Sequence, residues 1–123
     1  MTQRTILVVD DEPFICRSLT YILRKGDYRV LEARDGEEGL ALIREQKPDL
    51  VFLDVMMPKI DGFGVTKQVR ADAALDAVKI VLLTARGQEV DKANGKEAGA
   101  TEHLTKPFSP SRILDLVRQM LAN

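Results

Sequence analysis

Five short apolar runs recur along the chain, separated by longer stretches in which apolar and polar residues are mixed. The runs lie at Thr5–Asp10, Tyr28–Ala33, Asp49–Asp54, Val78–Thr84 and Thr101–Thr105. Most of them are continuously apolar and do not alternate with polar residues, which is typical of strands buried on both faces of a parallel sheet. We therefore expect five strands in one sheet that is covered on both sides.

The stretches between the runs carry apolar residues at helical spacing. These residues are Ile15, Leu19, Ile22 and Leu23 in the first stretch, Gly39, Leu40 and Ile43 in the second, Val65 and Val69 in the third, and Ile113, Val117, Met120 and Leu121 in the last. Each set falls on one face of a helix. Asp35 and Asp61 open the second and third helices, and Ser109 followed by Pro110 opens the last. Strands that alternate with helices predict one α/β domain over residues 1–123.

The stretch from Gln88 to Gly99 has the weakest helical pattern. Val90 is its only large aliphatic residue, and Asn94 and Gly95 lie in its middle. A glycine inside a helix costs about 1 kcal/mol relative to alanine. We expect this fourth helix to be the least stable of the five, with an ordinary exposed surface helix as the alternative explanation.

Composition narrows the classes of protein to consider. The chain has 123 residues, of which 45% are hydrophobic and 30% charged, and this fits one globular domain. A formal net charge of -1 gives no sign of nucleic-acid binding or of a basic membrane-binding patch. Cys16 is the only cysteine, which excludes an intrachain disulfide and favours a reducing, cytoplasmic location. No apolar run is long enough for a signal peptide or a membrane span.

Five polar residues stand at the carboxyl ends of the predicted strands. They are Asp10 and Asp11 after the first strand, Asp54 after the third, Thr84 after the fourth and Lys106 after the fifth. Parallel strands joined by right-handed crossovers have all their carboxyl ends at one edge of the sheet, where open α/β sheets bind ligands. We therefore expect these side chains to lie close together.

This set of side chains predicts phosphoryl transfer assisted by a metal ion. Three carboxylates and one amine leave an excess of negative charge, and a like-charge pair at about 4 Å is repelled by roughly 4 kcal/mol at an effective dielectric constant near 20. Carboxylates without histidine or cysteine nearby favour Mg²⁺ as the balancing ion. Asp54 is then the nucleophile that forms an aspartyl-phosphate, Lys106 stabilises the transferring group, and Thr84 donates its hydroxyl to a phosphoryl oxygen.

Four segments make the chain resemble the receiver domain of two-component response regulators, the chemotaxis receivers included. They are Val8-Val9-Asp10-Asp11-Glu12-Pro13, Leu53-Asp54-Val55-Met56-Met57-Pro58-Lys59-Ile60-Asp61-Gly62, Leu83-Thr84-Ala85 and Leu104-Thr105-Lys106-Pro107-Phe108. The resemblance covers essentially the whole chain and keeps the segments in order. It implies a doubly wound, flavodoxin-like receiver fold with five parallel strands in the order 2-1-3-4-5, five helices and a cis bond between Lys106 and Pro107.

The resemblance also implies how Mg²⁺ is bound and where phosphate attaches. Asp54 is the phospho-acceptor. Asp11, Asp54 and the backbone carbonyl of Met56 bind the ion directly, and Asp10 acts through a metal-bound water. The donor is a histidine kinase or a histidine phosphotransfer protein, so the chain is a switch and not a turnover enzyme.

The same resemblance implies that further residues transmit or tune the signal. Lys106 pairs with the phosphoryl group, Thr84 is the switch hydroxyl, and His103 replaces the aromatic ring that turns inward when the threonine moves. Because an imidazole changes its charge near neutral pH, we hypothesise that acid weakens this coupling. The surface of the fourth helix, fifth strand and fifth helix would then control an effector protein or an output domain. A phosphorylation-dependent homodimer is left open as a further partner, and the sequence does not identify the kinase or the target.

Residues at the rim of the site have both functional and ordinary explanations. Met56 and Arg86 either screen the phosphoryl group from water or simply line the rim. Not all of Phe14, Ile15 and Cys16 can face the core, and the apolar surface left over resembles the face with which receivers bind a kinase. Cys16 itself suits a small packing residue better than a redox sensor.

Three other functions compete with the receiver. An aspartate-nucleophile phosphatase typically carries a second carboxylate two residues after the nucleophile, where this chain has Met56. A nucleotide- or flavin-binding domain needs a glycine-rich loop after the first strand, where this chain has acids. A phosphate-independent receiver that only binds partners would not need the five polar residues. Asp11 alone has a simpler explanation as the N-cap of the first helix.

Overall fold

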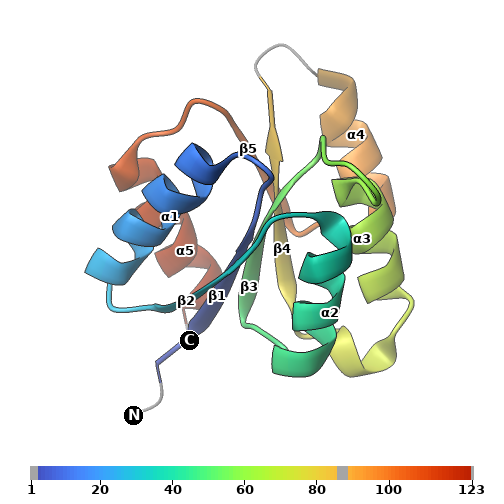
Figure 1. The fold of residues 1–123 in the computed structure, drawn as a ribbon, viewed down its shortest axis with the longest axis horizontal. Helices are drawn as coiled ribbons and strands as arrows, with labels where there is room; N and C mark the ends of the chain where they lie inside the picture. The colour runs from blue at the N-terminus through green and yellow to red at the C-terminus, as the bar shows by residue number, and fades with distance from the viewer. Residues whose placement is uncertain (1–2, 86–88, 123) are drawn as a thin grey trace.

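Five parallel strands form a twisted sheet that helices cover on both faces (Figure 1). The computed structural model describes residues 3–85 and 89–122. The strands are β1 (Thr5–Val9), β2 (Arg29–Ala33), β3 (Leu50–Asp54), β4 (Lys79–Thr84) and β5 (Glu102–Thr105). Their order in space is β2-β1-β3-β4-β5, so the predicted fold class and strand order are confirmed. Each strand is one residue shorter than predicted, although the Asp10 N–H still donates to the carbonyl of Ala33 at 3.2 Å.

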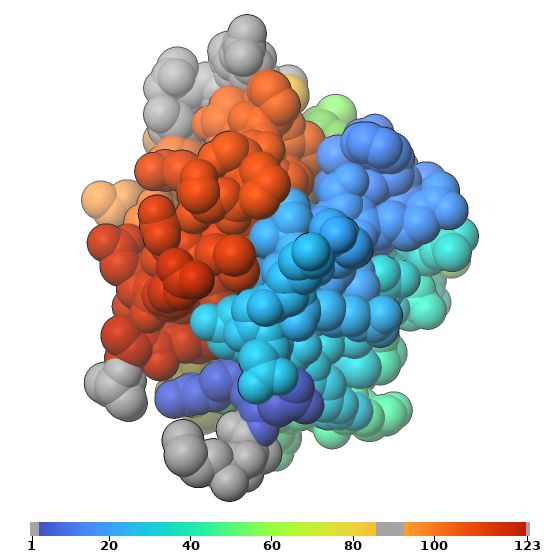
Figure 2. All heavy atoms as spheres, turned by 90° about the vertical axis from the view of Figure 1, so that its left-hand side faces the viewer, coloured from blue at the N-terminus to red at the C-terminus, as the bar shows by residue number. Residues whose placement is uncertain are grey.

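The strands are connected by helices and one short 3-10 turn. Within the described residues these are α1 (Pro13–Lys25), α2 (Gly36–Gln46), α3 (Gly62–Arg70), the 3-10 turn (Ala73–Leu75), α4 (Glu89–Ala98) and α5 (Pro110–Leu121). Helices α1 and α5 cover one face of the sheet, and α2, α3 and α4 cover the other (Figure 1). Figure 2 looks onto the first of these faces, where α1 in blue packs beside α5 in red. The apolar pattern did not predict the 3-10 turn.

Each face of the sheet has its own apolar core. Ile6, Val8, Phe52 and Val81 belong to the core under α1 and α5, whereas Leu7, Val9, Val51 and Leu53 belong to the core on the opposite face. Neighbouring residues of a strand divide between the two cores because successive side chains point to opposite faces. Strand β3 is buried along its whole length. Its last residue, Asp54, is therefore held by the most enclosed part of the sheet.

Three helices begin at the polar residues that the sequence indicates. Asp35 accepts a hydrogen bond from the N–H of Glu38, Asp61 from that of Gly64, and Ser109 from that of Arg112. These N-cap bonds satisfy amide groups that have no partner inside the helix.

The first helix does not begin at Asp11, which the simpler explanation took as its N-cap. Glu12 occupies the N-cap position of α1, and its side chain makes no capping bond. The amide of Glu12 instead donates to the Asp10 carboxylate at 2.9 Å. Asp11 as an N-cap is therefore wrong, because the helix begins one residue later and the side chain of Asp11 remains available to the site.

Helix α4 contains Gly95 in its middle, and the packing of the helix explains why a glycine is found there. A methyl group at Gly95 would lie 2.6 Å from the Cδ1 atom of Leu82 on β4. Glycine therefore lets α4 lie close against the sheet, which offsets its poor helix propensity. Gln88 and the side chain of Val90 lie outside the described residues.

None of the helices in the described ranges has the length and apolar character needed to cross a membrane.

Candidate functional site

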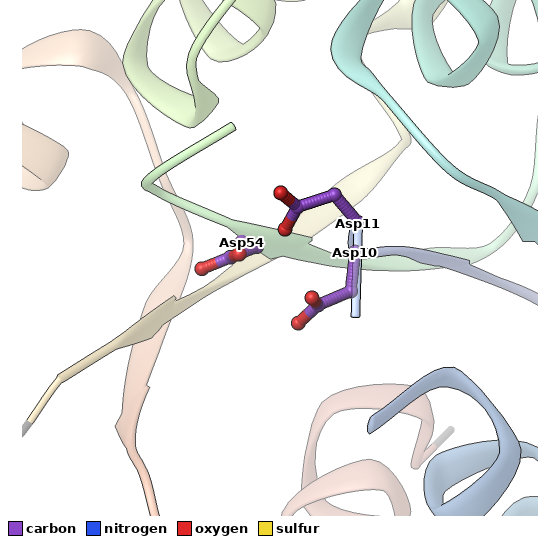
Figure 3. A group of neighbouring side chains, drawn as sticks. All are labelled: Asp10, Asp11 and Asp54. Carbon is purple, nitrogen blue, oxygen red and sulfur yellow. The ribbon is translucent and has the colours of Figure 1, made fainter. Parts of the chain in front are cut away.

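Three carboxylates gather where β1 and β3 end. Asp10 and Asp11 follow β1, and Asp54 closes the neighbouring strand β3. Figure 3 shows that their carboxylates project to the same side of these strand ends. One ligand oxygen from each residue lies within 4.8 Å of the others. Asp10 and Asp54 are 0% and 5% exposed, whereas Asp11 is exposed. The sheet thus brings together residues that are far apart in sequence.

Lys106 reaches this cluster from the loop after β5. Its Nζ atom lies 3.1 Å from Oδ2 of Asp10 and 3.4 Å from Oδ1 of Asp54. A third, weaker ion pair joins it to Glu12 at 3.7 Å. The Lys106–Pro107 peptide bond is cis, as the resemblance implies. Among the residues that the structure describes, one cation therefore faces several acids.

The electrostatics of the cluster leave Asp54 poorly stabilised as an anion. Burial, and then the charge of Asp10, raise the pKa of Asp54 to about 6, although Lys106 acts in the opposite direction. Burial also disfavours the charged amine of Lys106, but Asp54 and Asp10 together raise its pKa above the ordinary value. The amine stays charged, yet it does not balance the acids around it.

The donor set fits a hard divalent cation. Carboxylate oxygens are the ligands that Mg²⁺ prefers, and an Mg²⁺ site commonly uses one or two carboxylates together with water. Here two buried carboxylates and one exposed carboxylate stand within reach of a common point. The raised pKa of Asp54 shows that added positive charge at this point would be favourable.

Thr84 lies at the end of β4, beside the strand that carries Asp54. It is 2% exposed, and the register pairs Asp54 with Leu83, the residue before it. The carbonyl of Thr84 accepts a hydrogen bond from the Lys106 N–H at 2.8 Å. A backbone hydrogen bond therefore joins Lys106 to the residue that carries the predicted switch hydroxyl. Ala85, which follows, is exposed.

The outer residues of the predicted site are more open to water. The side chain of His103 on β5 is 34% exposed, and its Nδ1 atom lies 3.7 Å from a carboxylate oxygen of Glu102. It therefore occupies a half-exposed position in this structure. Met56 is 68% exposed at the rim. Arg86 lies outside the described residues. Phe14 is 73% exposed, so part of the apolar start of α1 does face solvent.

Cys16 lies beneath the cluster, and its surroundings do not suit a redox-active thiol. It is 4% exposed, and its thiol donates to the carbonyl of Asp10 at 3.3 Å. Burial and the nearby carboxylates of Asp10 and Glu32 raise the pKa of the Cys16 thiol to about 11. A thiol that is rarely ionised is a poor nucleophile, which favours the packing role.

Sequence reasoning missed two residues that shape the site. Glu12 enters the sequence analysis only as part of a segment shared with receivers, yet its carboxylate pairs with Lys106. Gly62 enters in the same way, yet a methyl group there would lie 2.6 Å from the carbonyl oxygen of Asp54. The acidic run Asp10–Glu12 was a signal for the first of them. The second depends on a contact between α3 and β3 that no local pattern contains.

Comparison with known proteins identifies the family. A family model described as the response regulator receiver domain matches residues 6–118. The chain belongs to this family. Receiver domains act as phosphorylation-dependent signalling switches in two-component systems, and this chain shares that general function.

Relatives of this receiver occur both as short proteins and within longer ones. Protein PilH of Pseudomonas aeruginosa is 41% identical over 117 residues, which cover 95% of this chain and 97% of PilH. The alkaline phosphatase synthesis transcriptional regulatory protein PhoP of Bacillus subtilis is 46% identical over 118 residues, which cover 96% of this chain but 48% of PhoP. The receiver thus spans about half the length of relatives such as PhoP.

Solved structures share the receiver's fold over nearly its whole length. The chemotaxis response regulator CheY4 of Vibrio cholerae superposes with a TM-score of 0.91 at 34% identity, covering 98% of this chain and 100% of that one. The receiver domain of the Francisella response regulator 1452 gives a TM-score of 0.87 at 28% identity, with 96% of both chains covered. The similarity to chemotaxis-type receivers is therefore confirmed.

Proposed function

We propose that residues 1–123 act as one phospho-acceptor unit in which Asp54 takes a phosphoryl group from a histidine kinase or a histidine phosphotransfer protein. A carboxylate oxygen of Asp54 attacks the phosphorus of the donor's phosphohistidine. The new O–P bond forms as the N–P bond breaks, and the imidazole leaves with the electron pair of the broken bond.

Mg²⁺ would neutralise the negative charge on the phosphoryl oxygens while the group is transferred. We assign Asp11, Asp54 and the backbone carbonyl of Met56 as its direct ligands, and Asp10 as a ligand through water. This assignment is supported by the close approach of the three carboxylate side chains. Asp10 also holds the amine of Lys106 at 3.1 Å, which keeps that cation beside the acceptor oxygen.

The remaining residues would hold the phosphoryl group and pass on its arrival. Lys106 pairs with a phosphoryl oxygen, and the hydroxyl of Thr84 donates to another. His103, one strand further along the sheet, would respond to the movement of Thr84 and alter the surface formed by α4, β5 and α5. An effector protein or an output domain would recognise that altered surface.

The observation that carries this proposal is the charge imbalance around Asp54. Within the described residues, Asp54 is a buried carboxylate with a pKa near 6 that lies beside two more acids and a single lysine. Such a carboxylate is suited to receive a cation and a phosphoryl group together. The position two residues after Asp54 is Met56, so the second carboxylate typical of aspartate-nucleophile phosphatases is not at its usual place. A phosphorylated switch is therefore favoured over a turnover enzyme.

Intact-mass measurement after incubation with Mg²⁺ and a small acyl-phosphate tests the proposal. The wild type should gain the mass of one phosphoryl group, and Asp54→Asn should not. Asp115→Asn, which changes an exposed carboxylate on α5, should react like the wild type. An unmodified wild-type protein would instead favour a receiver that binds partners without phosphate, and equal labelling of Asp54→Asn would place the phosphate elsewhere.

A further inference from the structure

The loop between β3 and α3, residues 55–61, is attached to the rest of the molecule by apolar packing and by few hydrogen bonds. Val55 is buried, and Met57 and Ile60 pack against the core on the face that α2 and α3 cover. Its ends are joined by a hydrogen bond from the N–H of Gly62 to the carbonyl of Val55, at 2.9 Å. Within the described part of the chain, residues 56–60 make no backbone hydrogen bond, and the Lys59 side chain makes their one hydrogen bond to another segment. The loop contains Met56, whose carbonyl is a proposed ligand of Mg²⁺, so its placement matters for the site.

Lys59 is held in an unusual conformation where the loop meets α2. Its φ angle is 71°, in the left-handed region that residues with a Cβ atom seldom adopt. Its Nζ atom lies 3.4 Å from Oδ2 of Asp35 and 3.6 Å from a carboxylate oxygen of Glu37. Such strain persists only where the surroundings hold it, and it tends to occur next to functional sites.

The first turn of α2 is a firm anchor for this lysine. Oδ1 of Asp35 accepts the N–H of Glu38 at 2.8 Å, and the Glu38 carboxylate accepts the N–H of Arg34 at 2.7 Å. These two bonds hold the entry of the helix, although they differ from a capping box, in which the Glu38 carboxylate would accept the N–H of Asp35 itself. One oxygen of Asp35 is thus used to cap the helix while the other holds Lys59.

Gly36 allows the loop to lie directly against the same turn. A methyl group at Gly36 would overlap the carbonyl oxygen of Ile60 and lie 3.0 Å from its carbonyl carbon. The atoms in the way belong to the backbone, so a larger residue could not be accommodated by a side-chain rotation. Gly36 therefore sets the distance between α2 and the loop.

We infer that the first turn of α2 is a positioning device for the metal-binding loop. Gly36 sets how closely the loop approaches. The ion pairs of Lys59 with Asp35 and Glu37 add to the apolar packing that holds the loop there. Together they would direct the Met56 carbonyl at the site. The inference rests on the proposed function, because it concerns the affinity of the proposed Mg²⁺ site.

Whether removal of the Lys59 charge weakens or tightens Mg²⁺ binding distinguishes positioning from simple charge repulsion. Lys59 is a cation near a site that binds a cation, so removing its charge without moving the loop would tighten Mg²⁺ binding. If the lysine holds the loop in place, removing it weakens binding. The two explanations therefore predict opposite changes in the dissociation constant.

Calorimetric titration of the whole chain with Mg²⁺, at constant pH and salt, tests the inference. For Lys59→Gln we expect the dissociation constant to rise about two- to fivefold, as for loss of an exposed ion pair. Lys59→Arg keeps the charge and should restore wild-type affinity. For Gly36→Ala we expect a rise of about tenfold, the lower range for residues that orient metal ligands. Urea unfolding without Mg²⁺ should accompany each titration, because a variant that is merely destabilised binds Mg²⁺ normally once folded.

Lys47→Gln is the matched control. Lys47 ends the same helix, also has a positive φ angle, of 45°, and is exposed. Its replacement removes the same charge in the same backbone conformation, so its Mg²⁺ affinity should equal that of the wild type.

Two results would overturn the inference, and they are distinguishable from failure of the proposed function. Unchanged or tighter Mg²⁺ binding by Lys59→Gln excludes positioning by this lysine, even if Gly36→Ala is too unstable to measure. An equal loss in Lys47→Gln excludes a specific role for the loop. If the wild type itself takes up neither Mg²⁺ nor phosphate, the proposed function fails first.

Discussion

Two clusters of acids and lysines lie at the same edge of the sheet and differ mainly in their exposure to water. The site cluster contains Asp10, Asp54 and Lys106, and the loop cluster contains Asp35, Glu37 and Lys59. The ion-pair distances are similar, 3.1 and 3.4 Å in the site cluster against 3.4 and 3.6 Å in the loop cluster. The lysine side chains, however, are 20% and 58% exposed. Similar geometry is thus found in two different environments.

The two environments shift the aspartate pKa values in opposite directions. Burial, and then Asp10, raise the pKa of Asp54 to about 6. A backbone hydrogen bond from Glu38, and then the charge of Lys59, lower the pKa of Asp35. A lysine at ion-pair distance therefore does not decide how a carboxylate titrates, because access to water and nearby N–H donors outweigh it. The site cluster is electrostatically unfavourable by itself, and the loop cluster is not.

The largest expected effect follows from removing the cation of the site cluster. Lys106→Met leaves Asp10 and Asp54 buried without their partner, and loss of one partner of a buried ion pair destabilises by on the order of 3 kcal/mol. Urea unfolding without Mg²⁺ should show this loss at pH 7.5. Lys59→Met, the same substitution in the loop cluster, should change the unfolding free energy far less, since exposed pairs contribute little. Equal losses in the two variants would contradict the distinction between the clusters.

An effect of opposite sign is expected when an acid is removed from the site cluster. The pKa of Asp54 is about 6 in the folded chain against an ordinary value of 3.8, so the folded state binds more protons between these values and its stability falls as pH rises through them. Asp54→Asn removes this penalty and should stabilise the Mg²⁺-free protein at pH 7.5 by on the order of 1 to 3 kcal/mol.

Low pH and Mg²⁺ should each reduce the gain in stability of Asp54→Asn over the wild type. Unfolding measured at pH 4.5 should show most of it lost, since Asp54 is then largely protonated in the folded wild type. Saturating Mg²⁺ at pH 7.5 should favour the wild type, if the ion binds beside Asp54 as proposed. If Asp54→Asn were less stable than the wild type at pH 7.5 without Mg²⁺, the Asp54 carboxylate would be a net stabilising group and the prediction would be wrong.

The order of the strands and the gathering of the acids could be predicted because both depend on simple regularities. Continuous apolar runs indicate a parallel sheet, and a parallel sheet places Asp10, Asp54 and Lys106 at one edge whatever their side-chain details. The strand order itself came from the resemblance to receivers. The helix starts at Asp35 and Asp61 were also predictable, because capping is a local interaction.

What could not be predicted depends on contacts between segments. The approach of Gly36 to Ile60 and of Gly62 to Asp54 depends on how closely two backbones pack. The pairing of Lys59 with Asp35 depends on a loop conformation with a left-handed residue. None of these has a spacing or a composition that marks it in one sequence.

The smallest expected effect tests the loop cluster with a substitution that changes charge alone. Asp35→Asn keeps an N-cap residue of equal quality, but it removes the anion that Lys59 and the helix N-terminus stabilise. Because the pKa of Asp35 is lowered in the folded state, its carboxylate stabilises the protein above the unfolded pKa and loses that effect only as pH falls through the lower, folded value. Asp35→Asn should therefore be slightly less stable than the wild type in urea.

The pH dependence of this loss completes the comparison. The loss in Asp35→Asn should be nearly the same at pH 7.5 and pH 4.5, since both lie above the ordinary pKa of 3.8 for an aspartate. The gain in Asp54→Asn should shrink over the same interval. If both differences faded together, the two carboxylates would share one environment, and burial would not be what separates the site cluster from the loop cluster.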